Sequence, residues 1–201
     1  MILATLVLAL FRLITQRSGC VRIDGLDISS ITLRSLRSAL SVIPQDPLLF
    51  HSSIRINLDP YGSVSDARLW AVLGQCQLGA VVRDLPGGLD FLVSDGGTNF
   101  SCGQKQLFCL ARALVRGSKI VVMDEATAAL DFETDQLMRK LVQEHFAHAT
   151  LLTIAHRSDT QSHETNADRK LHTVCQLAHV CDVFRFFFFF FFPQFEHDPR
   201  C

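Results

Sequence analysis

The sequence predicts an α/β domain built around a mostly parallel β-sheet, and three observations support this fold class. Short apolar runs at residues 40–43, 120–123 and 151–155 have the length of buried strands. An amphipathic helical pattern precedes the second run, and another separates it from the third. A strand–helix–strand order of this kind is typical of parallel sheets with right-handed crossovers.

The other elements follow from local patterns along the chain. Residues 21–25 alternate like a short strand that ends in a turn. Helices are predicted from apolar spacing at residues 2–14, 33–40, 66–77, 104–116 and 131–148. Breaks and turns are predicted at Ser18-Gly19, Pro44, Pro86-Gly87-Gly88 and Asp95-Gly96-Gly97.

The helix at residues 104–116 has the clearest pattern. Its apolar residues recur at i, i+3, i+4 and i+7, namely Leu107, Leu110, Ala111 and Leu114. Its basic residues fall largely outside that stripe: Lys105, Arg112 and Arg116. In the next helix, Asp131 stands at the position of an N-cap.

Composition narrows the class of protein. A chain of 201 residues with 48% hydrophobic and 19% charged residues has the make-up of one globular domain. A net charge of -1 and the lack of a basic patch disfavour a nucleic-acid-binding protein. The seven cysteines show no framework spacing, which favours reduced thiols. The apolar segments 1–11 and 186–192 are too short to span a bilayer.

Two short motifs carry phosphate chemistry. Asp124 and Glu125 follow the buried strand 120–123, where a carboxylate can hold Mg²⁺ and a second one can polarise a water. Ser101-Cys102-Gly103-Gln104 opens the clearest helix, and a helix N-terminus suits a phosphate. Alone, the acids could be a solvated turn and the Ser101 turn a plain helix cap. The pair, about twenty residues apart, is more specific than either.

Two further residues end predicted strands. His156 follows the strand 151–155, where it could reach a γ-phosphate. Gln45 follows the strand 40–43, where it could touch Mg²⁺ or the attacking water. A lone histidine or a loop glutamine is otherwise unremarkable, so these residues gain weight only from the motifs beside them.

Together these residues resemble the ABC (ATP-binding-cassette) ATPase family over residues 8–157. In family order they match the Q-loop, signature, Walker B, D-loop and switch histidine, at Gln45, 100–104, 120–125, 129–131 and His156. Segments VIPQDP and NLDP further resemble the second cassette of C-subfamily (multidrug-resistance-associated) transporters. The resemblance implies a P-loop-NTPase-like fold with a helical signature subdomain at roughly residues 57–116.

The resemblance also implies roles, cofactors and partners. ATP and Mg²⁺ would be the cofactors. Asp124 and Gln45 would bind Mg²⁺, Glu125 would be the general base, and His156 and Gln45 would contact the γ-phosphate and water. Ser101, Gly103, Gln104 and Asp131 would contact ATP held by a second cassette packed head-to-tail. Transmembrane domains would be the other partners, at the cytoplasmic face of a membrane, and export of organic anions or conjugates the function.

The sequence departs from the family in three places, one of which is Cys102, where the family usually has a small or aliphatic residue. The phosphate-binding loop G-x-x-x-x-G-K-[ST], its preceding strand and the adenine-stacking aromatic are not found among the 201 residues. We therefore expect residues 1–157 to be a partial cassette that hydrolyses ATP negligibly alone. Residues 158–201 are polar, then phenylalanine-rich, and are expected to be a non-family tail, disordered or translated from an incomplete gene model.

Three alternatives stay beside this interpretation. A non-enzymatic fragment could donate its signature motif to another cassette. A DNA-associated ATPase is disfavoured, because neither coiled-coil heptads nor a basic patch occur. Zinc binding by His172, Cys175, His179 and Cys181 is disfavoured, because the spacing fits no common zinc module.

Overall fold

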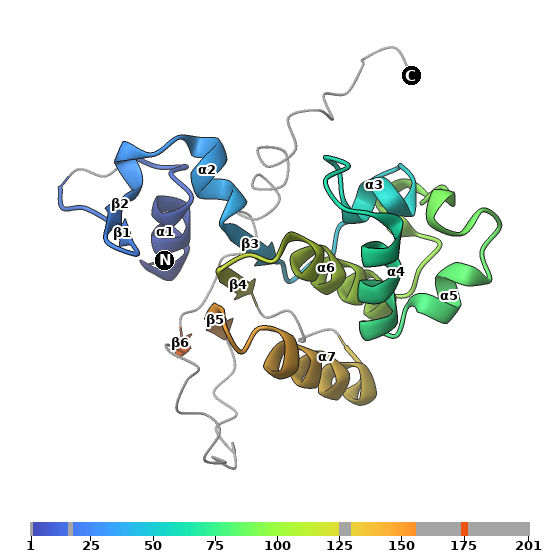
Figure 1. The fold of residues 1–201 in the computed structure, drawn as a ribbon. Helices are drawn as coiled ribbons and strands as arrows, with labels where there is room; N and C mark the ends of the chain where they lie inside the picture. Colours follow the sequence, from blue (N-terminus) through green and yellow to red (C-terminus); the bar gives the residue numbers. More distant parts are fainter. Residues whose placement is uncertain (1, 16–17, 125–129, 156–173, 177–201) are drawn as a thin grey trace.

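The computed structural model of the chain describes residues 2–15, 18–124, 130–155 and 174–176 (Figure 1). Its α-helices are α1 (Ile2–Leu10), α2 (Leu33–Ser38), α3 (Ile54–Leu58), α4 (Asp66–Gln75), α5 (Gly79–Arg83), α6 (Cys102–Arg116) and α7 (Phe132–His145). Its strands are β1 (Arg22–Ile23), β2 (Leu26–Asp27), β3 (Leu40–Ile43), β4 (Ile120–Asp124), β5 (Thr150–Ala155) and β6 (Val174–Gln176). Short 3₁₀ helices are η1 (Ile28–Ser30), η2 (Gly88–Asp90) and η3 (Asp95–Gly97). All five predicted helices and all four predicted strands are confirmed, with shifted ends.

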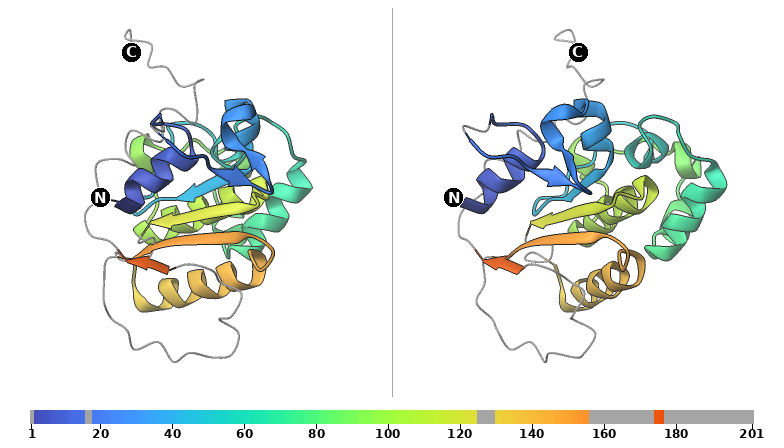
Figure 2. Two further views of the ribbon diagram at one scale, coloured as in Figure 1. Left: turned by 90° about the vertical axis from the view of Figure 1, so that its left-hand side faces the viewer. Right: turned by 60° about the vertical axis from the view of Figure 1, so that its left-hand side comes forward.

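The main sheet is parallel, as predicted. Its strands lie in the order β3-β4-β5-β6, which is also their order in the chain. Ile43 pairs with Met123, and Asp124 pairs with Ile154, so neighbouring strands end at one edge of the sheet. Figure 2 shows this sheet between α1 and α7. The carboxyl ends of the strands therefore come together, where ligands of open α/β sheets gather.

Helices cover both faces of the sheet because side chains alternate along each strand. Val122 packs with Val7 of α1 and with Phe11, which follows that helix, on one face. Val121 packs on the other face in a larger cluster that includes side chains of α6 and α7. Burial on both faces explains why β4 is a continuous apolar run rather than an alternating one.

Helix α1 ends four residues before the predicted end. Arg12 adopts a left-handed φ of 52°, its amide donates to Ala9 O at 3.0 Å, and the amide of Leu13 donates to Leu8 O at 2.8 Å. This is the Schellman pattern of a helix C-terminus, normally built with glycine. The Arg12 guanidinium donates to Ile28 O at 3.0 Å and Ile31 O at 2.7 Å. These bonds fix the chain reversal that the apolar pattern did not reveal.

The predicted strand at residues 21–25 is the first half of a hairpin. Arg22 pairs with Asp27 across a turn in which Asp24 and Gly25 have φ values of 50° and 81°. Two positive φ values in succession give the tight turn that matches strand twist. The second strand, β2, has two residues and is too short to leave a periodic signal.

Two serines that are far apart in the sequence form a hydrogen bond that joins β3 to the segment just before β4, its neighbour in the sheet. The hydroxyls of Ser41 in β3 and Ser118, just before β4, lie 2.7 Å apart and are buried. Because each hydroxyl has a buried partner in the other, neither is left without a hydrogen bond. The pair fixes the start of β4 beside β3.

The segment between β3 and β4 folds into a helical unit at one end of the molecule (Figure 1). Helix α4 packs its apolar face into the larger cluster, where Leu69 and Leu73 are buried beside Phe108 of α6. The α4 helix ends at Gln75 because Gln77 turns to a φ of 57°. Helices α3 and α5 have five residues each and were not predicted.

Strand β6 differs from the sequence expectation for residues 158–201. Thr153 pairs with Val174 and Ala155 with Gln176, in parallel. Three residues are too few for a periodic signal, and the open edge of β5 supplies the hydrogen-bonding partner. The rest of the proposed tail lies outside the described residues. No helix in the described part of the chain is long and apolar enough to cross a membrane.

Candidate nucleotide-contacting site

The site begins with the N-terminus of α6, which Ser101 caps. The Ser101 hydroxyl accepts a hydrogen bond from the Gln104 amide at 3.1 Å, and the Gln104 side chain accepts one from the Ser101 amide at 3.0 Å. This reciprocal capping box starts the helix two residues earlier than predicted. Both predicted residues are therefore present in one rigid turn.

The same turn suits a phosphate. Within the described residues, no acceptor pairs with the backbone amides of Cys102 and Gly103, the first two positions of the helix. Ser101 and Cys102 are exposed. Among the described residues the Ser101 hydroxyl only accepts a hydrogen bond, from the Gln104 amide, so its proton can be donated to a ligand. Unpaired amides at the positive end of a helix dipole bind anions, so the residues present fit a phosphate group.

Gly103 has a role in packing that the sequence did not reveal. A Cβ at this position would lie 3.1 Å from Cγ2 and 3.2 Å from Oγ1 of Thr134, near the start of α7. The atoms closest to Gly103 in the structure thus belong to α7 of the same chain. The glycine brings the N-termini of α6 and α7 into contact.

Asp131 is the N-cap of α7, as predicted. Its Oδ1 accepts from the Thr134 amide at 2.9 Å, and its Oδ2 accepts from the Thr134 hydroxyl at 2.8 Å. These two hydrogen bonds hold the pKa of Asp131 below its ordinary value of 3.8. The cap is therefore intact at neutral pH and is lost only as pH falls through this lowered pKa.

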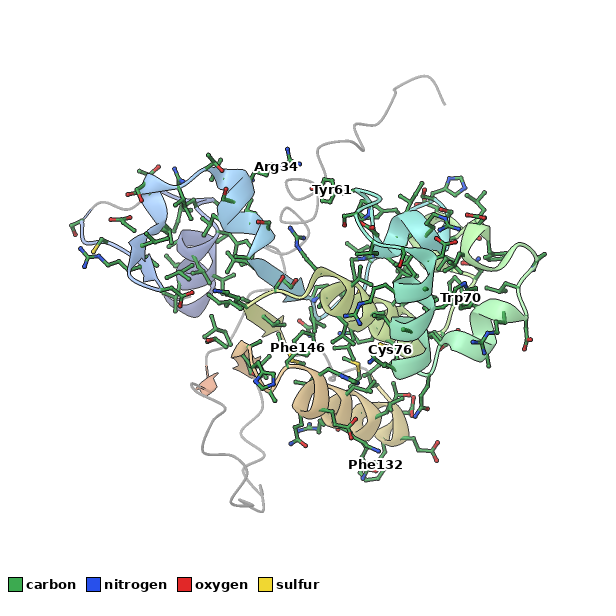
Figure 3. All side chains as sticks on the ribbon, in the orientation of Figure 1. Arg34, Tyr61, Trp70, Cys76, Phe132 and Phe146 are labelled. Carbon is green, nitrogen blue, oxygen red and sulfur yellow. The ribbon has the colours of Figure 1, made fainter. Side chains whose placement is uncertain are left out.

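An exposed aromatic side chain follows the cap. Phe132, the first residue of α7, is 74% exposed, and Figure 3 shows it directed away from the body of the protein. Phe146, just past the other end of α7, is buried, so the aromatic side chains at the two ends of this helix differ in exposure.

Two of the remaining predicted residues, Asp124 and Gln45, lie at the edge of the sheet where the strands end. Asp124 is the last residue of β4, and Gln45 follows β3 by two residues. Because Ile43 pairs with Met123, the backbone places both at the same edge of the sheet. Glu125 and His156 lie outside the described residues, immediately after β4 and β5. The backbone thus brings Asp124 and Gln45 to one edge, while the roles of all four residues stay predictions.

The buried side-chain amide of Gln106 holds the loop that contains Gln45. Gln106 Nε2 donates to Pro44 O at 2.9 Å, and the Gln106 side chain is almost fully buried. This bond ties the second turn of α6 to the residue before Gln45. The sequence did not predict this bond, because Gln106 is a polar residue next to the apolar stripe and its partner is far away in the chain.

A second buried contact fixes the segment that follows Gln45. The Arg112 guanidinium donates to Asn57 O at 2.7 Å, to Asn57 Oδ1 at 3.3 Å and to Leu48 O at 3.2 and 3.3 Å. Asn57 in turn donates to Phe50 O at 3.0 Å and accepts from the Phe50 amide at 2.8 Å. Burial lowers the pKa of Arg112 from 12.5, and the charge is held by carbonyl oxygens. We call these hydrogen bonds among Arg112, Asn57, Leu48 and Phe50 the Arg112 network.

Removing the Ser101 cap should weaken α6 measurably. We expect Ser101→Ala to lower the free energy of unfolding by about 1 kcal/mol, because the Gln104 amide loses its acceptor. Urea unfolding of the full chain checks this. Thr32→Ala is the matched control, since it removes one cap bond from the short helix α2. Equal stability of Ser101→Ala and the unchanged chain would contradict the capping role.

The geometry defines a class of protein first. A parallel sheet with helices on both faces, strand ends gathered at one edge and a phosphate-compatible helix N-terminus is the arrangement of P-loop-NTPase-like α/β domains. The chain belongs to the ABC transporter family, whose pattern it matches over residues 4–128.

Known relatives agree with this family. ATP-binding cassette sub-family C member 3 of Homo sapiens is 50% identical over 157 residues, which is 78% of this chain and 10% of that protein. ATP-binding cassette sub-family C member 8 of Homo sapiens is 52% identical over 153 residues, covering 76% of this chain and 10% of that protein. The chain thus spans about a tenth of the length of these relatives.

A solved structure confirms the fold. The structure of a bacterial Atm1-family ABC exporter with ATP bound matches with a TM-score of 0.70 at 36% identity. The match covers 78% of this chain and 28% of that chain. The predicted P-loop-NTPase-like fold and the relation to C-subfamily cassettes are both confirmed.

Proposed function

We propose that this chain is part of an ATP-binding cassette of an ABC exporter and helps to energise transmembrane transport of organic anions or conjugates. The observation that carries the proposal is the capped N-terminus of α6, where the Cys102 and Gly103 amides beside the Ser101 hydroxyl have no acceptor among the described residues. The identity to C-subfamily proteins and the match to a bacterial ABC exporter support the exporter class. The cytoplasmic face of a membrane follows as the proposed location.

The proposed roles divide the site into two parts. At the strand ends, Asp124 and Gln45 hold Mg²⁺, Glu125 takes the proton of the attacking water, and His156 with Gln45 contacts the γ-phosphate. At the helix N-termini, a second set contacts the ATP held by a partner cassette: Ser101, Gly103, Gln104 and Asp131. ATP supplies the phosphoanhydride bond whose hydrolysis drives transport.

The chain alone should hydrolyse ATP negligibly. The 201 residues contain no G-x-x-x-x-G-K-[ST] loop, so neither the amide cradle nor the lysine charge for the phosphates is supplied in cis. Steady-state phosphate release with Mg²⁺-ATP should stay at the background rate. Robust activity that Glu125→Gln abolishes would overturn this proposal.

The signature turn can be tested in trans with a native cysteine. Cys102 is exposed beside Ser101 and Gly103. With a mild oxidant added to take up the two electrons, its thiol can form a disulfide with a cysteine placed in the phosphate-binding loop of a purified C-subfamily cassette. Adding ATP should raise disulfide formation at least about tenfold, because nucleotide joins the two faces. Cys175, Cys181 and Cys201 are replaced by serine throughout the experiment.

Cys20 provides the matched control for this experiment. It is also exposed, but it lies before β1 and outside the proposed contact face. Cys102→Ser should abolish the ATP-dependent disulfide, and Cys20→Ser should leave it unchanged. Disulfide formation that is independent of ATP would refute the proposal of a signature face shared with a partner.

A further inference from the structure

We propose that Thr134 is a positioning residue that couples the Asp131 cap to the Ser101–Gln104 turn within one chain. The inference rests on the proposed function, in which both turns contact the same ATP held by a partner. It goes further by naming the residue through which a change at one turn reaches the other.

The first support is the contact between the two helix N-termini. The position of a Cβ at Gly103 would be only 3.1 Å from Thr134 Cγ2 and 3.2 Å from Thr134 Oγ1. Such distances are shorter than ordinary van der Waals contact, so Gly103 accepts no side chain unless Thr134 moves. The packing of α6 on α7 at this end therefore depends on the rotamer of one threonine.

The second support is that Asp131 fixes that rotamer. The Thr134 hydroxyl donates to Asp131 Oδ2 at 2.8 Å, while its amide donates to Asp131 Oδ1 at 2.9 Å. Turning Thr134 about χ1 breaks the hydroxyl bond, because Oγ1 and Cγ2 move together. The methyl that faces Gly103 is thus held in place by the carboxylate of the cap.

The third support is the rigidity of the turn on the other side. Ser101 and Gln104 exchange two hydrogen bonds across Gly103, so this glycine cannot shift without disturbing the capping box. Asp131 and Ser101 are both exposed. A ligand that draws Asp131 away from Thr134 therefore loosens the Ser101–Gln104 turn, and a ligand that fixes that turn favours the Asp131 cap.

Hydrogen exchange of the full chain tests the coupling without any partner. We expect Asp131→Ala to raise the exchange rate of the Gln104 amide at least about threefold, although Gln104 lies in a different helix. Ser65→Ala, which removes the cap bond to Arg68 in α4, is the control and should leave the Gln104 amide unchanged. An effect of Asp131→Ala confined to α7 would overturn the inference.

A double substitution separates coupling from general destabilisation. Gly103→Ala should raise exchange of the residue 134 amide at least about threefold, because the new methyl displaces Thr134. In a Thr134→Ala background the two closest atoms are gone and Thr134 Cβ is 3.6 Å away, an ordinary contact, so Gly103→Ala should then have no effect. Additive effects of the two substitutions would contradict the proposal.

The two proposals fail in distinguishable ways. Coupled exchange rates without an ATP-dependent disulfide at Cys102 would contradict the shared-ATP function while leaving the contact between the two turns established. An ATP-dependent disulfide with uncoupled exchange rates would overturn the role of Thr134 alone. Unfolding midpoints of all variants, measured in parallel, identify any change that spreads through the whole domain.

Discussion

Replacing Arg112 by methionine is expected to lower the free energy of unfolding by about 3 kcal/mol. Methionine can fill the space of the aliphatic stem, but it leaves Leu48 O and Asn57 O without their Arg112 donors, and Asn57 Oδ1 keeps only the Phe50 amide. Each buried acceptor that loses its partner costs about 1 kcal/mol. Urea denaturation of the full chain, read by circular dichroism, measures the change.

Two further variants define how specific this effect is. Arg112→Lys keeps the charge but lacks the planar fork, so we expect a smaller loss of about 1.5 kcal/mol. Lys119→Met is the matched control, because Lys119 and its partner Asp24 are both exposed. It should change stability by less than about 0.5 kcal/mol. A similar loss in both methionine variants would mean that the Arg112 network has no special contribution.

Phe108→Ala should have the largest effect on stability of all the variants considered, about 4 kcal/mol. Phe108 is 1% exposed and meets Phe100 edge to face, with ring centroids 5.0 Å apart. Truncation removes apolar burial and leaves a cavity where α6 packs into the larger cluster. The unfolding midpoint in urea and the thermal midpoint should both fall.

Leu92→Ala is the control for this second prediction. Leu92 lies in the same helical unit and is 58% exposed, so its truncation removes little buried area. A change below about 0.5 kcal/mol is expected. If Phe108→Ala cost no more than Leu92→Ala, the placement of Phe108 in the core would be wrong.

The elements that the sequence predicted are those whose signals are local. Strands β3 and β4 are covered on both faces, so their apolar runs stand out from the flanking polar residues. Helix α6 has fifteen residues, which is long enough for its periodicity to be unambiguous. Helices α3 and α5 and strands β2 and β6 are too short to repeat a pattern. They exist because neighbouring elements complete their hydrogen bonds and burial.

In the candidate site, too, the residues with local signals were predictable and those with distant partners were not. Ser101, Gln104 and Asp131 were predictable because helix caps use side chains within three residues. Arg112 lies outside the apolar stripe of its helix, yet the structure partly buries it against Leu48 and Asn57. The sequence pattern did not predict this, because these partners lie 64 and 55 residues away. The contact between Gly103 and Thr134 likewise joins two helices. No periodicity in a single segment can report such contacts.

The hydrogen bond between Ser41 and Ser118 has a consequence for the order of folding. These residues are 77 positions apart, and closing a loop of that length costs on the order of 4 kcal/mol in chain entropy. Adjacent strands of the sheet therefore cannot pair early unless the intervening helices have already become compact. During synthesis, β3 cannot pair with β4 until the ribosome has made the whole helical unit between them. Folding should accordingly be slow, with a rate set by loop closure rather than by helix formation.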